Sequence, residues 1–170
     1  MTMRMKKIIS FMAVAATMLL TACDGHQDFP DTAMKVGHIL CTDGKTMSYE
    51  DYQTSGKQAI AVVFNINQSE EMEGNGYAVY LWDIAPEAFA DSMGVNQKTS
   101  ADLSAYDGNT NTFALYSAKN VRSPLAMSVV DLWRYGQSAY IPTVAQMRLL
   151  YHAKNAINPL IVKCGGTPIP

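Results

Sequence analysis

The arrangement of apolar and polar positions in the first half of the chain predicts a small β-sheet. Residues 59–66 (AIAVVFNI) are nearly all apolar and include several β-branched side chains, which is typical of a buried central strand. Residues 76–84 (GYAVYLWDI) predict a second strand, and the polar loop 67–75 suits an antiparallel connection between the two. Residues 36–42 predict a shorter strand that ends at an Asp-Gly turn signal.

The second half of the chain has the three-to-four-residue spacing of helices. The segments predicted as helical are 86–92, as one or two turns, then 111–119, 124–135 and 143–154. A last helix is expected to begin with Asn158 as the N-cap and Pro159 at its first position, and to end at two glycines. Strands and helices together predict an α+β fold, a small antiparallel sheet with several helices.

The helix at 143–154 has the clearest signals. Thr143 and Gln146 form a T-x-x-Q capping box, in which each residue satisfies a backbone N–H of the first turn. The apolar stripe that we expect this helix to bury is Val144, Met147, Leu150 and Tyr151. The corresponding face of 124–135 is Leu125, Val129, Leu132 and Trp133.

The N-terminus has the features of an export signal. Residues 1–7 contain three basic side chains and no acidic one, and residues 8–22 carry no charge. Fifteen uncharged residues, most of them apolar, are fewer than the roughly 20 that an uncleaved membrane-spanning anchor needs. The sequence Leu-Thr-Ala-Cys that ends at Cys23 resembles the bacterial lipobox, which implies removal of residues 1–22 and lipid attachment, palmitate included, at Cys23.

A lipid at Cys23 divides the chain into a signal peptide (1–22), a polar tether (23–35) and a domain (36–170). The 148 residues that remain after cleavage would hold 10 basic and 15 acidic side chains, because three basic residues leave with the signal. This mildly acidic balance gives no broad basic surface for nucleic acid. We therefore expect the membrane, through the lipid anchor, to be one partner.

No motif in the sequence indicates a metal site, a cofactor or catalysis. The histidines lack partners at ligand spacings, and Asp107 begins a calcium-loop-like pattern that lacks the required glycine and glutamate. A turn followed by a helix N-cap explains Asp107 better. The glutamates in loop 67–75 are best explained as a solvated loop tip. We therefore expect a protein that is not an enzyme.

Two cysteines and one tryptophan are the remaining candidates for special roles. Cys41 and Cys164 could form a disulfide in an exported protein, or they could be two separately buried thiols. Most aromatic residues are expected in the core. Trp82 is the candidate for ligand contact, because its neighbours Val79 and Leu81 belong to the opposite face of a strand.

The chain from Val36 onward resembles the C-type-lectin-like domains of Bacteroidales surface lipoproteins, which are related to the Fibrobacter major paralogous domain. The residues that carry the resemblance are VGHIL (36–40) with DG (43–44), AIAVVF (59–64), DG (107–108) with NT (111–112), YIPT (140–143) with the helix 146–151, and NP (158–159) through GGTP (165–168). Two features depart from the pattern. Ala139 stands where an aromatic residue is usual, and the strands that follow GGTP in such domains are missing.

The resemblance implies a partial C-type-lectin-like domain on a lipid-anchored protein of the cell envelope. The expected location is the outer membrane, on its periplasmic or surface-exposed face, although the residues after Cys23 also suit retention in the inner membrane. The expected function is non-catalytic binding or adhesion, with a glycan or a protein as the ligand. The alternatives are an accessory structural subunit that a partner chain completes, or a truncated paralogue without function.

Overall fold

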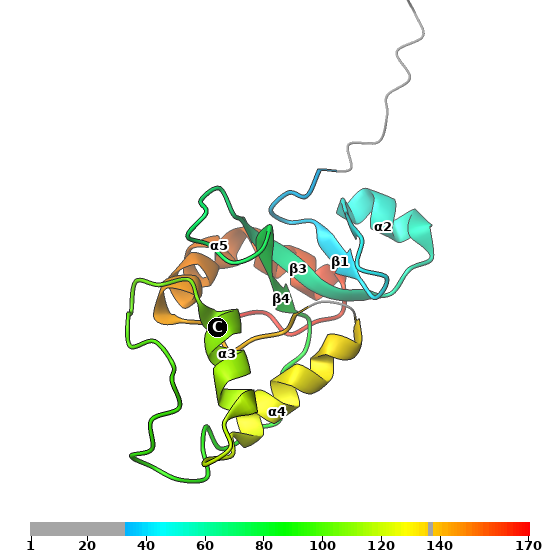
Figure 1. Cartoon of the computed structure of the whole chain (residues 1–170). Helices are drawn as coiled ribbons and strands as arrows, with labels where there is room; N and C mark the ends of the chain where they lie inside the picture. The colour runs from blue at the N-terminus through cyan, green and yellow to red at the C-terminus, as the bar shows by residue number, and fades with distance from the viewer. Residues whose placement is uncertain (1–32, 136–137) are drawn as a thin grey trace, which may run out of the picture. The chain divides into compact units, whose positions relative to one another are not determined.

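The computed structural model describes residues 33–135 and 138–170, and Ala33–Pro170 forms one compact unit. The predicted signal peptide, Cys23 and most of the tether lie outside the described residues. The unit has an α+β fold in which an antiparallel sheet is combined with helices, as the sequence predicts (Figure 1).

The sheet has four strands in the order β2-β1-β3-β4, and all neighbours are antiparallel. The strands are β1 (Ile39–Cys41), β2 (Thr46–Met47), β3 (Ala59–Ile66) and β4 (Gly76–Tyr80). The three predicted strands are present. Strand β2 was not predicted, because two residues are too few to show an alternating pattern.

Strand β4 is four residues shorter than predicted. The backbone N–H of Leu81 still bonds to the carbonyl of Ile60 at 3.0 Å, but the carbonyl of Leu81 accepts a bond from the backbone N–H of Thr167 at 3.0 Å. The C-terminal segment therefore takes over the pairing at this point, and residues 82–84 run outside the ladder.

Helix α2 (Tyr49–Ser55) was not predicted. Its N-terminus is capped by Ser48, whose side chain accepts a hydrogen bond from the backbone N–H of Asp51 at 3.0 Å. Gly56 ends the helix in the left-handed conformation, with φ of 66°. The helix buries none of its residues completely, so its sequence lacks the apolar periodicity by which a helix is recognised.

The prediction of helical turns at 86–92 is wrong. The backbone of this segment bonds to residues 122–125 instead of to itself. The carbonyl of Ala88 accepts from the N–H of Leu125 at 3.1 Å, and the N–H of Asp91 donates to the carbonyl of Arg122 at 2.9 Å. These tertiary bonds replace the local ladder that a helix would need.

The next helices lie close to their predicted positions. Helix α3 (Gly108–Ser117) begins three residues early, with Asp107 as its N-cap. Helix α4 (Pro124–Val130) continues as the 3₁₀ helix η1 (Asp131–Tyr135), and the two together cover the predicted 124–135. Helices α3 and α4 pack against each other below the sheet in Figure 1.

Helix α5 (Val144–Lys163) is one continuous helix, whereas two helices were predicted. Asn158 does not cap a helix: its side-chain amide donates to the carbonyl of Ile169 and accepts from the same residue's N–H, both at 2.9 Å. Pro159 is accommodated inside the helix, where its ring is exposed. Gly165, with φ of 78°, and Gly166 end the helix through backbone bonds to Val162 and Ile161, the pattern of a Schellman motif.

Helix α5 covers one face of the sheet and forms the main core with it (Figure 1). The buried members of this core are Ile39, Cys41, Ala59, Val62, Phe64, Tyr77, Leu81, Ile157 and Ile161. The predicted capping box is confirmed, because the Gln146 side chain accepts from the Thr143 N–H at 2.9 Å and the Thr143 hydroxyl accepts from the Gln146 N–H at 3.3 Å.

The predicted buried stripe at the start of α5 is wrong for three of its four residues, and only Leu150 packs against the core. Val144, Met147 and Tyr151 are 50%, 48% and 65% exposed, and Leu150 is only half-buried. The first turns of α5 instead bury Ala145 and Gln146. The helix is thus rotated relative to the expected face, since a polar side chain with internal hydrogen bonds occupies the buried position.

Candidate functional site

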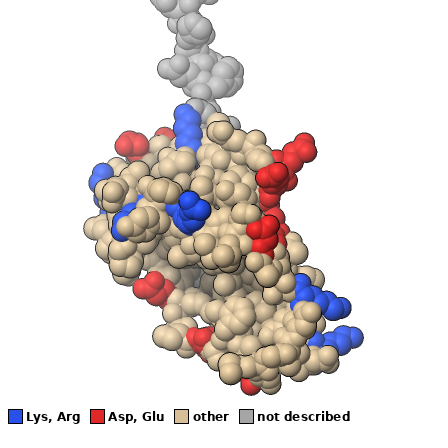
Figure 2. All heavy atoms as spheres, turned by 90° about the vertical axis from the view of Figure 1, so that its left-hand side faces the viewer, with Lys and Arg blue, Asp and Glu red and all other residues tan. Residues whose placement is uncertain are grey.

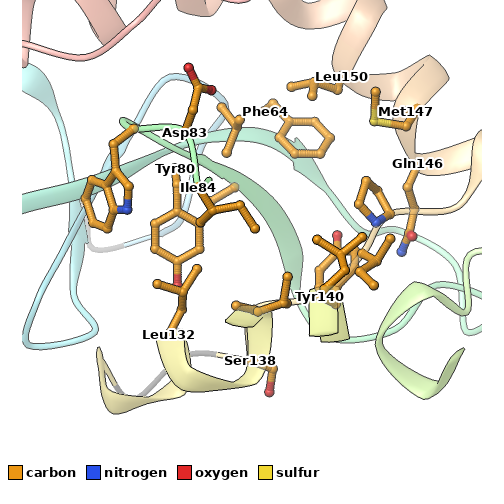
Figure 3. A pocket seen from close by; sticks show the side chains of 18 residues that line it. Phe64, Tyr80, Asp83, Ile84, Leu132, Ser138, Tyr140, Gln146, Met147 and Leu150 are labelled. Carbon is orange, nitrogen blue, oxygen red and sulfur yellow. The ribbon is translucent and has the colours of Figure 1, made fainter. Parts of the chain in front are cut away.

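A groove of about 440 Å³ lies between β4 with the segment after it, the α4–η1 face, and the first turns of α5 (Figure 3). The lining is mostly aliphatic and aromatic. The predicted apolar face of 124–135 contributes Leu125, Val129 and Leu132 to one wall, and these residues are buried or half-buried. The volume falls within the roughly 300–1,000 Å³ that is typical of ligand sites.

Aromatic rings from the sheet line the groove. In Figure 3, Tyr80 of β4 lies between Ile84 and Leu132, and Phe64 of β3 lies on the side of Leu150. Phe64 also belongs to the main core, which fixes its ring from behind.

The predicted contact residue Trp82 also lines the groove and is 36% exposed. Its ring centroid lies 5.1 Å from that of Tyr80, so the two rings form one aromatic surface. Val79 and Leu81 pack with the main core, as the strand alternation predicts. The structure thus places Trp82 beside a cavity, and its role in ligand contact stays a prediction.

Three other aromatic residues, Tyr77, Tyr140 and Trp133, make contacts that support the fold, and Tyr140 also lines the groove. Tyr77 is buried, and its ring lies 6.0 Å from Phe64 and 5.9 Å from Tyr140. Burial, with smaller contributions from Tyr77 and Glu73, raises the pKa of Tyr140 far above its ordinary value, so its hydroxyl stays protonated. The indole of Trp133 donates to the carbonyl of Ala139 at 2.7 Å.

The second wall of the groove, residues 138–142, is held in place by two buried polar side chains. The Gln146 amide donates to the carbonyl of Tyr106 at 3.1 Å and accepts from the Thr143 N–H. The hydroxyl of Thr112 accepts from the Ile141 N–H at 2.8 Å and donates to the carbonyl of Gly108 at 2.7 Å. The sequence predicts Gln146 only as a capping residue and no role for Thr112, because Tyr106 and Ile141, to which they bond, are distant in sequence.

One glutamate of the loop 67–75 has a structural role that the sequence did not reveal. The Glu73 carboxylate accepts from the backbone N–H of Asn109 at 2.8 Å and of Thr110 at 3.1 Å, and also from the Thr110 hydroxyl. It therefore caps the N-terminus of α3, where a negative charge is favourable. The interpretation as a solvated loop tip holds for the exposed Glu70 and Glu71 and is wrong for Glu73.

Cys41 and Cys164 are free thiols in the structure. Cys41 is buried at the end of β1, and Cys164 is half-buried at the end of α5, where it packs against the cluster that contains Cys41. The two residues thus belong to one apolar cluster, and the disulfide stays a prediction. Burial is the main cause that raises the pKa of each thiol.

We expect the two thiols in the reduced protein to differ in reactivity. At neutral pH both are protonated, and Cys164 should react with iodoacetamide at least about tenfold faster than Cys41, because only Cys41 needs local opening of the core to be reached. Peptide mapping after timed alkylation measures both rates. Equal alkylation rates would contradict the burial of Cys41. A mass of the unreduced protein that is lower than that of the reduced protein by two hydrogens would establish the disulfide.

Within the described residues, no group of three or more His, Cys, Asp or Glu side chains is placed to hold a metal ion. Figure 2 shows several acidic side chains at one edge of the face in view, with other acidic and basic side chains scattered over it. In residues 33–135 and 138–170 no helix is both long and apolar enough to cross a membrane.

Comparisons with protein-family models, curated proteins and solved structures find no match for this chain.

Proposed function

We propose that this chain is a lipid-anchored protein of the cell envelope that acts as a non-catalytic binding or adhesion module, with the groove as its ligand site. The observation that carries the proposal is the apolar groove with the exposed Trp82 among its lining residues. Ligand sites are typically concave and apolar, with aromatic residues that supply contact area. The lipobox at Cys23 and the resemblance to C-type-lectin-like domains support the location and the class of function.

Binding is tested with a glycan array and with pull-down of surface proteins, each using the purified full chain. We expect a captured ligand whose affinity falls at least about tenfold in Trp82→Ala, since an aromatic contact residue in a ligand site is a typical energetic hot spot. Phe89→Ala is the matched control, because Phe89 is an exposed aromatic residue that does not line the groove. A folded protein that captures no ligand of any class, or a captured ligand whose affinity is unchanged in Trp82→Ala, would contradict the groove as its ligand site.

The lipid anchor is tested with Cys23→Ser. We expect the variant to lose metabolic labelling with palmitate and to keep residues 1–22, since the thiol is the site of acylation and lipid attachment precedes cleavage. Cys164→Ser is the control that keeps Cys23. Unchanged labelling of the Cys23→Ser variant would refute lipidation at this residue.

A second candidate function is that of an accessory subunit completed by a partner chain. The observation that favours it is the position of β4, which pairs only with β3 within the described residues. A strand at the end of a sheet can accept a strand from another chain. Sedimentation and thermal unfolding decide this: a monomer that is soluble and unfolds cooperatively would count against it.

A further inference from the structure

We propose that the groove binds an anionic amphiphile with a single aliphatic chain, such as a free fatty acid. The chain would lie in the groove, and the carboxylate would face Arg148 and His152 on α5. This inference rests on the proposed function, because it names the ligand of the same site.

The chemistry of the lining favours an aliphatic chain over a polar ligand. Among the side chains that line the groove, Gln146 already uses its amide in bonds to Thr143 and Tyr106. The carboxylate of Asp83 points away from the centre of the groove in Figure 3. The lining also holds the hydroxyls of Ser138, Tyr80 and Tyr140, but most of it is aliphatic or aromatic, and a hydrocarbon chain covers such a surface without polar groups of its own to satisfy.

The apolar surface continues beyond the groove onto the exposed side of α5. Pro142 and Met147 line both the groove and a shallow depression next to it, whose other lining residues are Val144, Arg148, Tyr151 and His152. Three of these residues are the exposed members of the stripe that was wrongly predicted to be buried: Val144, Met147 and Tyr151. A ligand that leaves the groove at Met147 therefore meets Arg148 and His152 directly.

The charged residues near the groove determine which end of the ligand lies at α5. Arg148 and His152 are four residues apart on α5, so they are neighbours on one side of the helix. The Nζ atom of Lys154 lies 4.3 Å from the centroid of the Tyr151 ring and also donates to the carbonyl of Pro170 at 3.0 Å, so its charge is already engaged and Arg148 is the cation that the ligand would meet. A carboxylate is thus attracted at the α5 end of the groove, where Arg148 lies next to Met147.

The size of the groove points to one chain. A volume of about 440 Å³ is near the lower end of the range for ligand sites, which suits one aliphatic chain better than the two chains of a phospholipid. We therefore propose that the aliphatic chain comes from a free single-chain ligand. Binding to membrane lipid is the alternative that the experiment distinguishes.

The test is isothermal titration of the full chain carrying Cys23→Ser, so that no attached acyl chain competes, with dodecanoate below its micelle concentration. We expect saturable binding of one dodecanoate per chain, at least about tenfold weaker binding of dodecyltrimethylammonium, and no binding of acetate. Met147→Glu should weaken the binding of dodecanoate at least about tenfold, because it places a negative charge next to the aliphatic chain and close to the ligand's carboxylate. Arg148→Gln should remove the preference for the anionic head group.

The matched control is Val162→Glu, which introduces the same charge on α5 at an exposed position outside the groove. It should bind dodecanoate as the parent does. If dodecanoate fails to bind while a glycan or protein is still captured and is lost in Trp82→Ala, this inference is wrong and the proposed function stands. If nothing binds, both are wrong. Binding of phosphatidylglycerol vesicles without binding of dodecanoate would also overturn the inference.

Discussion

Replacing Ile161 with alanine should lower the free energy of unfolding by about 4 kcal/mol, the upper part of the range for deletion of a fully buried aliphatic side chain. Ile161 has no exposed surface and lies in the core between α5 and the sheet. It also packs against Gly166, where an added Cβ would lie 2.9 Å from its Cγ2 atom. A cavity at this position would therefore loosen both the helix and the C-terminal segment that bonds to Leu81.

Urea unfolding followed by circular dichroism measures this loss. Val162→Ala is the matched control, because Val162 is the next residue of the same helix and is 56% exposed. The control should change stability by less than about 0.5 kcal/mol, since alanine also has the higher helix propensity. A loss below about 1.5 kcal/mol for Ile161→Ala would mean that α5 does not pack on the sheet as described.

Replacing Gln146 with leucine should cost about 3 kcal/mol, although leucine is more apolar and the position is fully buried. The carbonyl of Tyr106 would lose its donor, and the N–H of Thr143 would lose its acceptor. Each buried polar group left without a partner costs about 1–3 kcal/mol, which exceeds the gain from burying an aliphatic side chain of similar size.

Gln53→Leu on the exposed surface of α2 is the control and should be close to neutral. Because Gln146 also holds the wall of the groove, its loss should weaken ligand binding in protein that is still folded. Hydrogen exchange supplies a second readout: the amide of Thr143 should lose protection in Gln146→Leu but keep it in Gln53→Leu. A neutral effect of Gln146→Leu on stability would show that the pair of bonds contributes nothing.

The elements that were predicted well are those whose signals are local. Strand β3 is a nearly unbroken apolar run, and the capping box at Thr143 is contained within four residues. The segment 86–92 and Asn158 were misinterpreted for the same physical reason. The backbone groups of 86–92 and the side chain of Asn158 bond to residues that are distant in sequence, and these bonds outweigh the local preference.

In the candidate site, too, local signals could be predicted and long-range contacts could not. Trp82 was predicted as a contact residue because alternation along a strand separates two faces, which is a local property. The groove around it needs β4, α4 and the wall at 138–142, and their proximity depends on the hydrogen bonds of Gln146 and Thr112. No spacing in the sequence contains that information.

From the order of its residues alone, the chain specifies an α+β fold, the buried strand β3, the turn after β1 and the capped start of α5, because each depends on periodicity or on a contact within one turn. Tertiary packing alone determines which side of α5 is buried. The amide of Gln146 bonds to the N-cap residue Thr143 and to Tyr106, so this side faces inward. The apolar residues Val144, Met147 and Tyr151 are exposed as a result. Periodicity locates an apolar face, but the hydrogen bonds of a buried polar residue determine whether that face is covered.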